Sequence, residues 1–211
     1  SDTQLHLLGI TRTEKIQEFA RLGVGSFDST SPLRQAFKDD KDNYYTLDRQ
    51  YTAIRIPQVE GNPKLQKAIS SGAVSQERAR KLERACLDVM RRFDDGAASV
   101  AEAVERLREY ENLYDPGKDH TAAYMDTLAA APWKACPCDV CRALGHHVIL
   151  FRGAERNRRR GFHNIWVFYR RLARETCVAP PGSPEPSARA RGATKRRKRA
   201  NHEERTSRPS D

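Results

Sequence analysis

The stretch CPCDVCRALGHHVILFRGAERNRRRGFH, from Cys136 to His163, carries the strongest information about how this chain folds. It places three thiols within six residues and a histidine 22 positions after the last of them. Thiolates and a neutral imidazole at such spacing suit a tetrahedral zinc ion, whose short bonds close a loop of chain. A site with four protein ligands leaves no position for water. The stretch therefore predicts a structural zinc site that holds the surrounding chain in place.

The predicted ligands are three cysteines and one histidine: Cys136, Cys138, Cys141 and His163. His146 and His147 are nearer in sequence and remain competitors for the fourth position, whereas His120 is expected to be a loop residue. The chain has five cysteines, and an odd number with three of them clustered suits a metal in a reducing compartment better than a disulfide framework. Cys86 falls in a helical apolar pattern and is predicted to lie in the core.

The composition favours a partner of high negative charge. The 211 residues carry a net charge of +10 with a pI near 9.6, and only 38% of them are hydrophobic. Because the excess positive charge lies mostly in the last third, nucleic acid is favoured over an anionic membrane surface. No apolar run approaches the roughly 20 residues needed to cross a bilayer, and no signal-peptide pattern begins the chain. We therefore expect a soluble cytoplasmic protein with no membrane partner, and the start at Ser1 without methionine suggests a fragment.

The first part of the chain has a pattern typical of parallel β-sheets. Leu5 to Ile10 predicts a buried strand, Ile16 to Leu22 has helical periodicity, and Val24 to Phe27 predicts a second buried strand. Strand, helix and strand in this order form a βαβ unit. Asp28 directly follows the second strand, where α/β folds carry their working residues, so it is a candidate for catalysis. On position alone, a turn or capping role is the more ordinary function of such an aspartate.

Residues 38 to 53 are charged and aromatic and predict an exposed loop. Tyr44, Tyr45 and Tyr51 could stack on bases there or simply pack the loop onto the domain, and both interpretations stay open. Further elements follow from periodicity, two short strands and four helices: strands at 54–59 and 148–151, helices at 75–93, 99–113, 121–130 and 162–172. The last of these helices is expected to begin at the histidine. Residues 177–211 lack periodicity and predict a disordered basic tail.

Two motifs occur in an order known from one family. The segment LLGITRTEKIQEFARLGVGSFDSTSPLR resembles a strand, turn, helix and second strand that precede an FDxxxPxR signature, here Phe27, Asp28, Pro32 and Arg34. The second motif is CxCxxC with a distant His-Asn pair, here His163 and Asn164. Together they resemble the tRNA-guanine transglycosylase (queuine/archaeosine tRNA-ribosyltransferase) family, which exchanges a guanine for a 7-deazaguanine in nucleic acid.

The family fold is an α/β barrel of the (β/α)8 type, with the zinc subdomain inserted between the last strand and the last helix. The resemblance implies that this chain is the C-terminal portion of such a TIM barrel with an inserted zinc-binding subdomain, because a complete barrel needs about 250 residues. It divides the chain into four parts. Residues 1–37 hold the last two barrel strands and the nucleophile loop, and residues 38–131 form a mainly helical insertion. Residues 132–176 form the zinc-binding subdomain with the closing helix, and residues 177–211 form the basic tail.

The loop after the PxR signature and the arginine-rich segment before His163 differ from the family's tRNA enzymes. The chain looks more like the branch known as DpdA, which places 7-deazaguanine bases in DNA. This implies a DNA substrate and a preQ0-like base, with a tRNA-guanine transglycosylase proper as the alternative. A rival of another class is a zinc-stabilised nucleic-acid-binding module without catalysis. A helper protein or a homodimer is left open.

The resemblance assigns the nucleophile to Asp28, which would form a covalent glycosyl-enzyme and divide one hard displacement into two easier ones. The family's second acid lies in the N-terminal half, so the isolated chain is expected to be inactive. Between Arg152 and Arg174 there are eight arginines and one acid, which favours a phosphate-binding surface over a merely solvated basic face. Six arginines are the predicted nucleic-acid contacts: Arg34, Arg152, Arg156, Arg158, Arg159 and Arg160.

Overall fold

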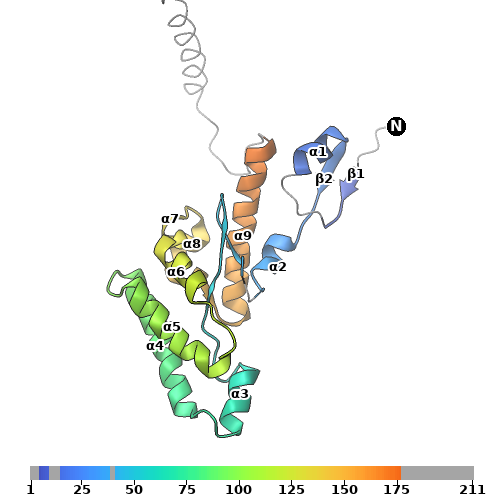
Figure 1. The fold of residues 1–211 in the computed structure, drawn as a ribbon. Coiled ribbons are helices and arrows are strands. Elements are labelled where there is room, and N and C mark those ends of the chain that lie inside the picture. The colour runs from blue at the N-terminus through green and yellow to red at the C-terminus, as the bar shows by residue number, and fades with distance from the viewer. Residues whose placement is uncertain (1–4, 10–14, 39–40, 177–211) are drawn as a thin grey trace, which may run out of the picture. The chain divides into compact units, whose positions relative to one another are not determined.

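Helices dominate this fold, and its strands occur only as short pairs (Figure 1). The structure is a computed structural model that describes residues 5–9, 15–38 and 41–176, so the predicted tail 177–211 lies outside the described residues. Within the described ranges the strands form three two-stranded sheets, and no barrel is formed. The fold is therefore a mixture of helices and strands, with the helical part larger than the α/β pattern predicts.

The predicted βαβ unit is present at the start of the described chain. It consists of β1 (Leu5–Leu7), α1 (Ile16–Arg21) and β2 (Val24–Phe27), and the two strands are parallel. The prediction that both strands are buried is wrong, since Leu5 is 51% exposed, and Leu8 just beyond β1 is 76% exposed. Parallel strands are stable when both faces are covered, and the described part of the chain does not supply that cover.

The segment predicted to be an exposed loop contains a small hairpin instead. After α2 (Ser31–Gln35), β3 (Tyr44–Tyr45) pairs antiparallel with β4 (Gln50–Tyr51). The buried side chain of Asn43 stabilises this hairpin because it accepts a hydrogen bond from the Ala53 amide and donates one to the Lys38 carbonyl. Tyr44 is fully buried and is not available for stacking on a base. The polar composition of the segment concealed these inward contacts.

The two helices predicted at 75–93 and 99–113 are confirmed, and they form a helical hairpin. After α3 (Pro63–Ser70), α4 (Gln76–Asp94) and α5 (Val100–Tyr114) pack against each other. Ser75 and Ser99 cap these two helices, since each hydroxyl accepts a hydrogen bond from a first-turn amide. The apolar stripe of α4, including Cys86, is buried as its spacing predicted.

The remaining elements surround the cysteines. They are α6 (Thr121–Ala130), α7 (Pro132–Ala135), α8 (Asp139–Leu144), the 3-10 helix η2 (Gly145–Val148), β6 (Leu150–Phe151) and α9 (Gly153–Thr176). β6 pairs in parallel with β5 (Ile54–Arg55), so the segment after the cysteines shares a sheet with the segment before the helical hairpin. One hydrophobic core accordingly contains side chains from both segments.

The last helix begins earlier than predicted. It begins at Gly153 and not at Phe162, so the arginine cluster and His163 both lie inside α9. Arginine has a high helix propensity, and the buried side chains of Asn157 and Arg160 give this first part of the helix an inward face. Among the described helices, none combines the length and the hydropathy that crossing a bilayer requires.

Candidate metal centre and nucleophile

Four side chains converge at the centre that the sequence predicted. The ligand atoms of this set all lie within 4.8 Å of one another: Cys136, Cys138, Cys141 and His163. His163 Nδ1 lies 3.3 to 3.6 Å from the three sulfur atoms. Bonds of about 2.3 Å to sulfur and about 2.0 Å to nitrogen separate two ligands of a tetrahedral zinc ion by about 3.5 Å. The donor set and its spacing therefore fit a metal ion with three cysteines and one histidine.

The CxCxxC spacing produces this convergence through a short helix. Cys138 is the N-cap of α8, and its sulfur accepts a hydrogen bond of 3.3 Å from the Cys141 amide. One helical turn then returns the Cys141 side chain to the same side of the backbone. The local sequence thus places two sulfur ligands without help from distant residues.

His163 is oriented by a strand that is distant in sequence. Its Nε2 donates a hydrogen bond of 2.8 Å to the Tyr45 carbonyl, which leaves Nδ1 as the unprotonated nitrogen facing the sulfurs. Such an outer hydrogen bond is the usual way in which a protein fixes the tautomer of a metal-binding histidine. His146 and His147 do not join the centre, and the His146 ring instead lies 3.0 Å from Asp94.

Tyr44 forms one wall of the centre and was missed as a functional residue in the sequence. Its ring stacks on the His163 ring at a centroid distance of 4.1 Å and an angle of 16°. Its hydroxyl lies 3.3 Å from the Cys141 sulfur, where it can donate to a thiolate. Burial raises the pKa of Tyr44, so the hydroxyl keeps the proton that it donates. The adjacent tyrosines of β3 were the available signal, because alternate strand residues point to opposite faces.

The pKa values of Cys136 and Cys141 are shifted in opposite directions. Hydrogen bonds from Cys138 and Cys141 lower the pKa of Cys136 to about 3. The contacts with Cys136 and Cys138, together with burial, raise the pKa of Cys141. One thiolate is therefore favourable, but further thiolates need a compensating positive charge. A metal ion would supply that charge, since metal-bound cysteines are deprotonated.

A second polar cluster holds the cysteine segment against the helical hairpin. Asp94, at the end of α4, accepts hydrogen bonds from Trp133 Nε1 at 2.8 Å and from the His146 amide at 3.2 Å. Lys134 donates to the Asp94 backbone carbonyl at 2.7 Å. These contacts join α4, α7 and η2 around one carboxylate.

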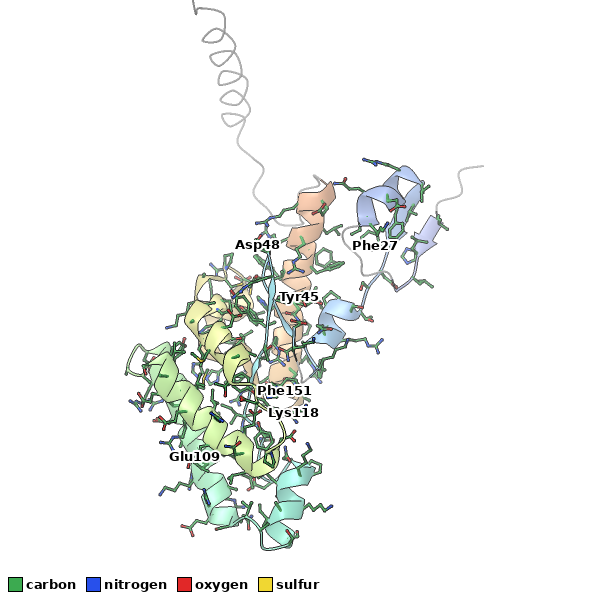
Figure 2. All side chains as sticks on the ribbon, viewed as in Figure 1. Phe27, Tyr45, Asp48, Glu109, Lys118 and Phe151 are labelled. Carbon is green, nitrogen blue, oxygen red and sulfur yellow. The ribbon has the colours of Figure 1, made fainter. Side chains whose placement is uncertain are left out.

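Asp28 is exposed and follows Phe27 at the end of β2, where Figure 2 labels Phe27. Its amide donates to the Leu7 carbonyl, which extends the pairing with β1. Its Oδ1 accepts a hydrogen bond of 2.7 Å from the Gly9 amide. Gly9 has a φ of +71°, a conformation that favours glycine. The ends of the two parallel strands thus fix the direction of the Asp28 carboxylate.

The structure separates the six predicted arginines into two groups. Arg160 is fully buried and donates to the backbone carbonyls of Leu150, Val148 and Ala36 and to the side chain of Asn157. Burial lowers its pKa to about 9, which leaves it protonated at neutral pH. It therefore joins three backbone segments and does not face solvent.

Arg152 is also largely engaged within the fold. Its guanidinium pairs with Glu83 of α4, and it donates to the Ile56 carbonyl at 3.2 Å. In contrast, Arg34 on α2 and Arg158 on α9 are exposed, and Arg156 and Arg159 are partly buried. Arg159 pairs with Glu155 one turn earlier in α9. Four of the six predicted side chains are thus at or near the surface.

The comparisons with known proteins agree with the two motifs. No model of a known protein family matches the chain. Over 176 residues the chain is 51% identical to a DNA-guanine transglycosylase of Salmonella montevideo, an alignment that covers 82% of this chain and 42% of the relative. This similarity supports the transglycosylase family that the motifs predicted. The chain spans about two fifths of the length of this curated relative.

Proposed function

We propose that this chain is part of a base-exchange glycosyltransferase that replaces guanine in DNA with a 7-deazaguanine such as a preQ0-like base. The observation that carries the proposal is the 51% identity to a protein named DNA-guanine transglycosylase. The position of Asp28 at the end of a parallel strand supports it, because catalytic residues of α/β folds gather at such strand ends. A tRNA substrate is the alternative within the same chemistry.

The proposed reaction has two displacements at the sugar C1′ atom. In the first, Asp28 attacks C1′, and the bond to guanine N9 breaks with its electron pair on the departing base. A general acid outside this chain protonates that base. In the second, the same group removes the N9 proton of the 7-deazaguanine, which attacks C1′ and releases the Asp28 carboxylate. Each step inverts C1′, so the product keeps the original configuration, as in retaining glycosidases.

We propose that the metal centre binds zinc through Cys136, Cys138, Cys141 and His163. Bound zinc would supply positive charge for the thiolates and would close the loop between α7 and α9. With four protein ligands, the centre has a structural role. The residues that act on the nucleic acid are then those around Asp28 and not the metal ligands.

The proposed nucleic-acid contacts are the surface arginines of the predicted set: Arg34, Arg156, Arg158 and Arg159. Burial lowers the pKa of Arg156, and repulsion from Arg152 and Arg159 lowers it further. Burial and the charges of His146, Arg156 and Arg159 lower the pKa of His147. A phosphate backbone would relieve this accumulation of positive charge, and its binding would weaken as salt concentration rises.

We further propose that β1 and β2 are the last strands of a (β/α)8 barrel, of which residues 1–37 form the end. The exposed side chains of Leu5, Leu8 and Leu22 support this, because further strands and helices would cover them. We propose the same division for the rest of the chain: a helical insertion at 38–131, the zinc subdomain with the closing helix at 132–176, and the basic tail at 177–211. The isolated chain is then inactive, because it lacks the second acid.

The test uses the complete protein that contains this chain, DNA and a 7-deazaguanine base. With wild type, we expect base exchange and a protein–DNA adduct that survives denaturation. Asp28→Asn should abolish both, whereas Asp95→Asn, the same change at an exposed aspartate at the end of α4, should alter neither. Exchange by Asp28→Asn would contradict the nucleophile. Zinc and DNA binding by wild type without exchange would favour the non-catalytic module, and exchange in tRNA alone would favour the alternative substrate.

A further inference from the structure

One turn of α9 contacts both the metal centre and the segment that follows Asp28. This turn, Arg160–Asn164, contains the metal ligand His163, whose side chain faces the sulfurs. Arg160, Gly161 and Asn164 of the same turn contact α2 or its C-cap. α2 is one of the main packing partners of α9. Ser31, the first residue of α2, lies three positions after Asp28. The same helical turn therefore lies between the two candidate functional sites.

The turn holds α2 near both of its ends. Asn164 Nδ2 donates to the Pro32 carbonyl at 3.2 Å, in the first turn of α2. Arg160 donates to the Ala36 carbonyl at 2.6 Å, just after the last residue of α2. Both carbonyls accept from side chains that are buried. These two hydrogen bonds fix the position of α2 along the α9 surface.

Gly161 allows the two helices to approach each other closely. A Cβ atom placed on Gly161 would overlap the side chain of Leu33, in the middle of α2. The absence of a side chain at this position, and not its backbone conformation, is what the contact needs, because Gly161 lies inside a regular helix. The middle of α2 is thus held by shape where its ends are held by hydrogen bonds.

Asn164 also contacts the metal side of the turn. Its Oδ1 accepts a hydrogen bond of 3.0 Å from the Tyr45 amide. The carbonyl of the same residue, Tyr45, accepts the bond from His163 Nε2 that sets the histidine tautomer. Figure 2 labels Tyr45 on the strand that lies against α9. The buried side chain of Asn164 therefore bonds both to Tyr45, which orients the metal ligand His163, and to the start of α2.

We propose that Asn164 is a positioning residue for Asp28, assisted by Arg160 and Gly161. The metal centre fixes the register of α9, and this turn passes that constraint to α2 and so to the segment that carries the nucleophile. The inference rests on the proposed function, in which Asp28 attacks the sugar. A displacement of about 1 Å at a reacting group can reduce the rate by about 100-fold, so the position of α2 matters to catalysis.

Asn164→Asp removes the donor of this side chain and keeps its acceptor. The variant keeps the oxygen that accepts from the Tyr45 amide and loses the donor to the Pro32 and Asn43 carbonyls. In the complete protein we expect full metal content and an unchanged absorption spectrum with Co²⁺ in place of zinc. We expect kcat to fall about 10- to 100-fold with a KM for DNA that changes little. Hydrogen exchange of the α2 amides should become faster.

The matched control is Asn112→Asp, the same chemical change at an exposed position of α5, which should leave every readout unchanged. If Asn164→Asp does not fold, Gly161→Ala gives a second test. It should force the end of the Leu33 side chain to shift and lower kcat, and the added change Leu33→Ala should restore part of the rate because it removes the overlapping side chain.

Normal kcat in Asn164→Asp with normal exchange of α2 amides would overturn the inference. Loss of metal together with loss of activity would also overturn it, since the residue would then serve only the metal centre. Neither result would affect the proposed function, which is tested separately by base exchange in the wild type and in Asp28→Asn. Restored activity in Gly161→Ala/Leu33→Ala would support the inference independently of Asn164.

Discussion

The segment around the metal centre and the β1–α1–β2 unit differ in how their residues are held. Around the metal centre, Tyr44, Trp133 and His163 are each at most 2% exposed, and their polar atoms have partners in other elements. In the β1–α1–β2 unit, Leu8 and Leu22 are more than 70% exposed. The first region has the properties of a completed core, and the second those of a surface that needs further cover.

This difference separates stability from chemistry. The candidate metal centre brings together four possible ligands in a buried region, whereas Asp28 lies in the loosely covered unit. Residues that hold the fold and residues that would act on the nucleic acid therefore lie in different regions. The contacts from α9 to α2 connect them. The following experiments test this division, from the largest expected effect to the smallest.

Loss of a metal ligand should have the largest effect. Cys138→Ala should abolish stoichiometric zinc binding and most of the stability of the metal region, because structural zinc sites contribute about 10–16 kcal/mol of binding free energy to folding. Elemental analysis and thermal unfolding with and without chelator measure this. Cys86→Ala removes a buried thiol outside the centre and should retain the metal. Full zinc content in Cys138→Ala would contradict the assigned centre.

Arg160 should have the next largest effect. Arg160→Met leaves the Ala36 and Leu150 carbonyls without their donor, at a cost of about 1–3 kcal/mol for each buried acceptor. The midpoint of urea unfolding should fall accordingly. Arg158→Met, on the exposed side of the same helix, should change the free energy of unfolding by less than about 0.5 kcal/mol. Equal effects of the two variants would refute the buried role of Arg160.

Asp94 gives a prediction on pH. Burial raises its pKa, but hydrogen bonds from Trp133 and His146 outweigh this and hold the pKa below its usual value. A lowered pKa in the folded state stabilises the protein above the unfolded value of about 3.9, and this stability is lost as the pH falls through the lower folded value.

Asp94→Asn should therefore be about 1–2 kcal/mol less stable than wild type at pH 7, because it loses hydrogen bonds to a charged group. The difference should shrink as the pH falls below about 4. Chemical unfolding of both proteins across this range provides the measurement. A difference that is constant with pH would show that the Asp94 charge does not contribute.

Leucine substitutions should show the smallest effect and the clearest contrast between the regions. Leu22→Ser in this 211-residue chain should change the free energy of unfolding by less than about 0.5 kcal/mol, because the side chain is 72% exposed. Leu65→Ser, at a fully buried position, should cost at least about 2 kcal/mol. A large effect of Leu22→Ser would mean that the β1–α1–β2 unit has a core of its own.

The sequence predicted the elements whose signals are local. The helices 75–93, 99–113 and 121–130 agree with α4, α5 and α6 to within about one residue at each end, because a helical stripe repeats over neighbouring residues. The strand 24–27 and its parallel partner were predicted from short apolar runs, which are also a local signal. The beginning of α9 was missed because the side chains that it buries, Asn157 and Arg160, are polar and so produce no apolar stripe.

By itself, the sequence determined which four side chains form the candidate metal centre, since ligand chemistry and the CxCxxC spacing are properties of the residues. Only the tertiary structure decided that Tyr44 lines the metal centre, and that Arg160 is a buried structural residue while Arg158 is exposed. The physical reason is that two side chains of the same type differ in burial and in role only through the partners, distant in sequence, that they contact. A tyrosine or an arginine acquires its role from the carbonyls, rings and carboxylates that folding brings against it.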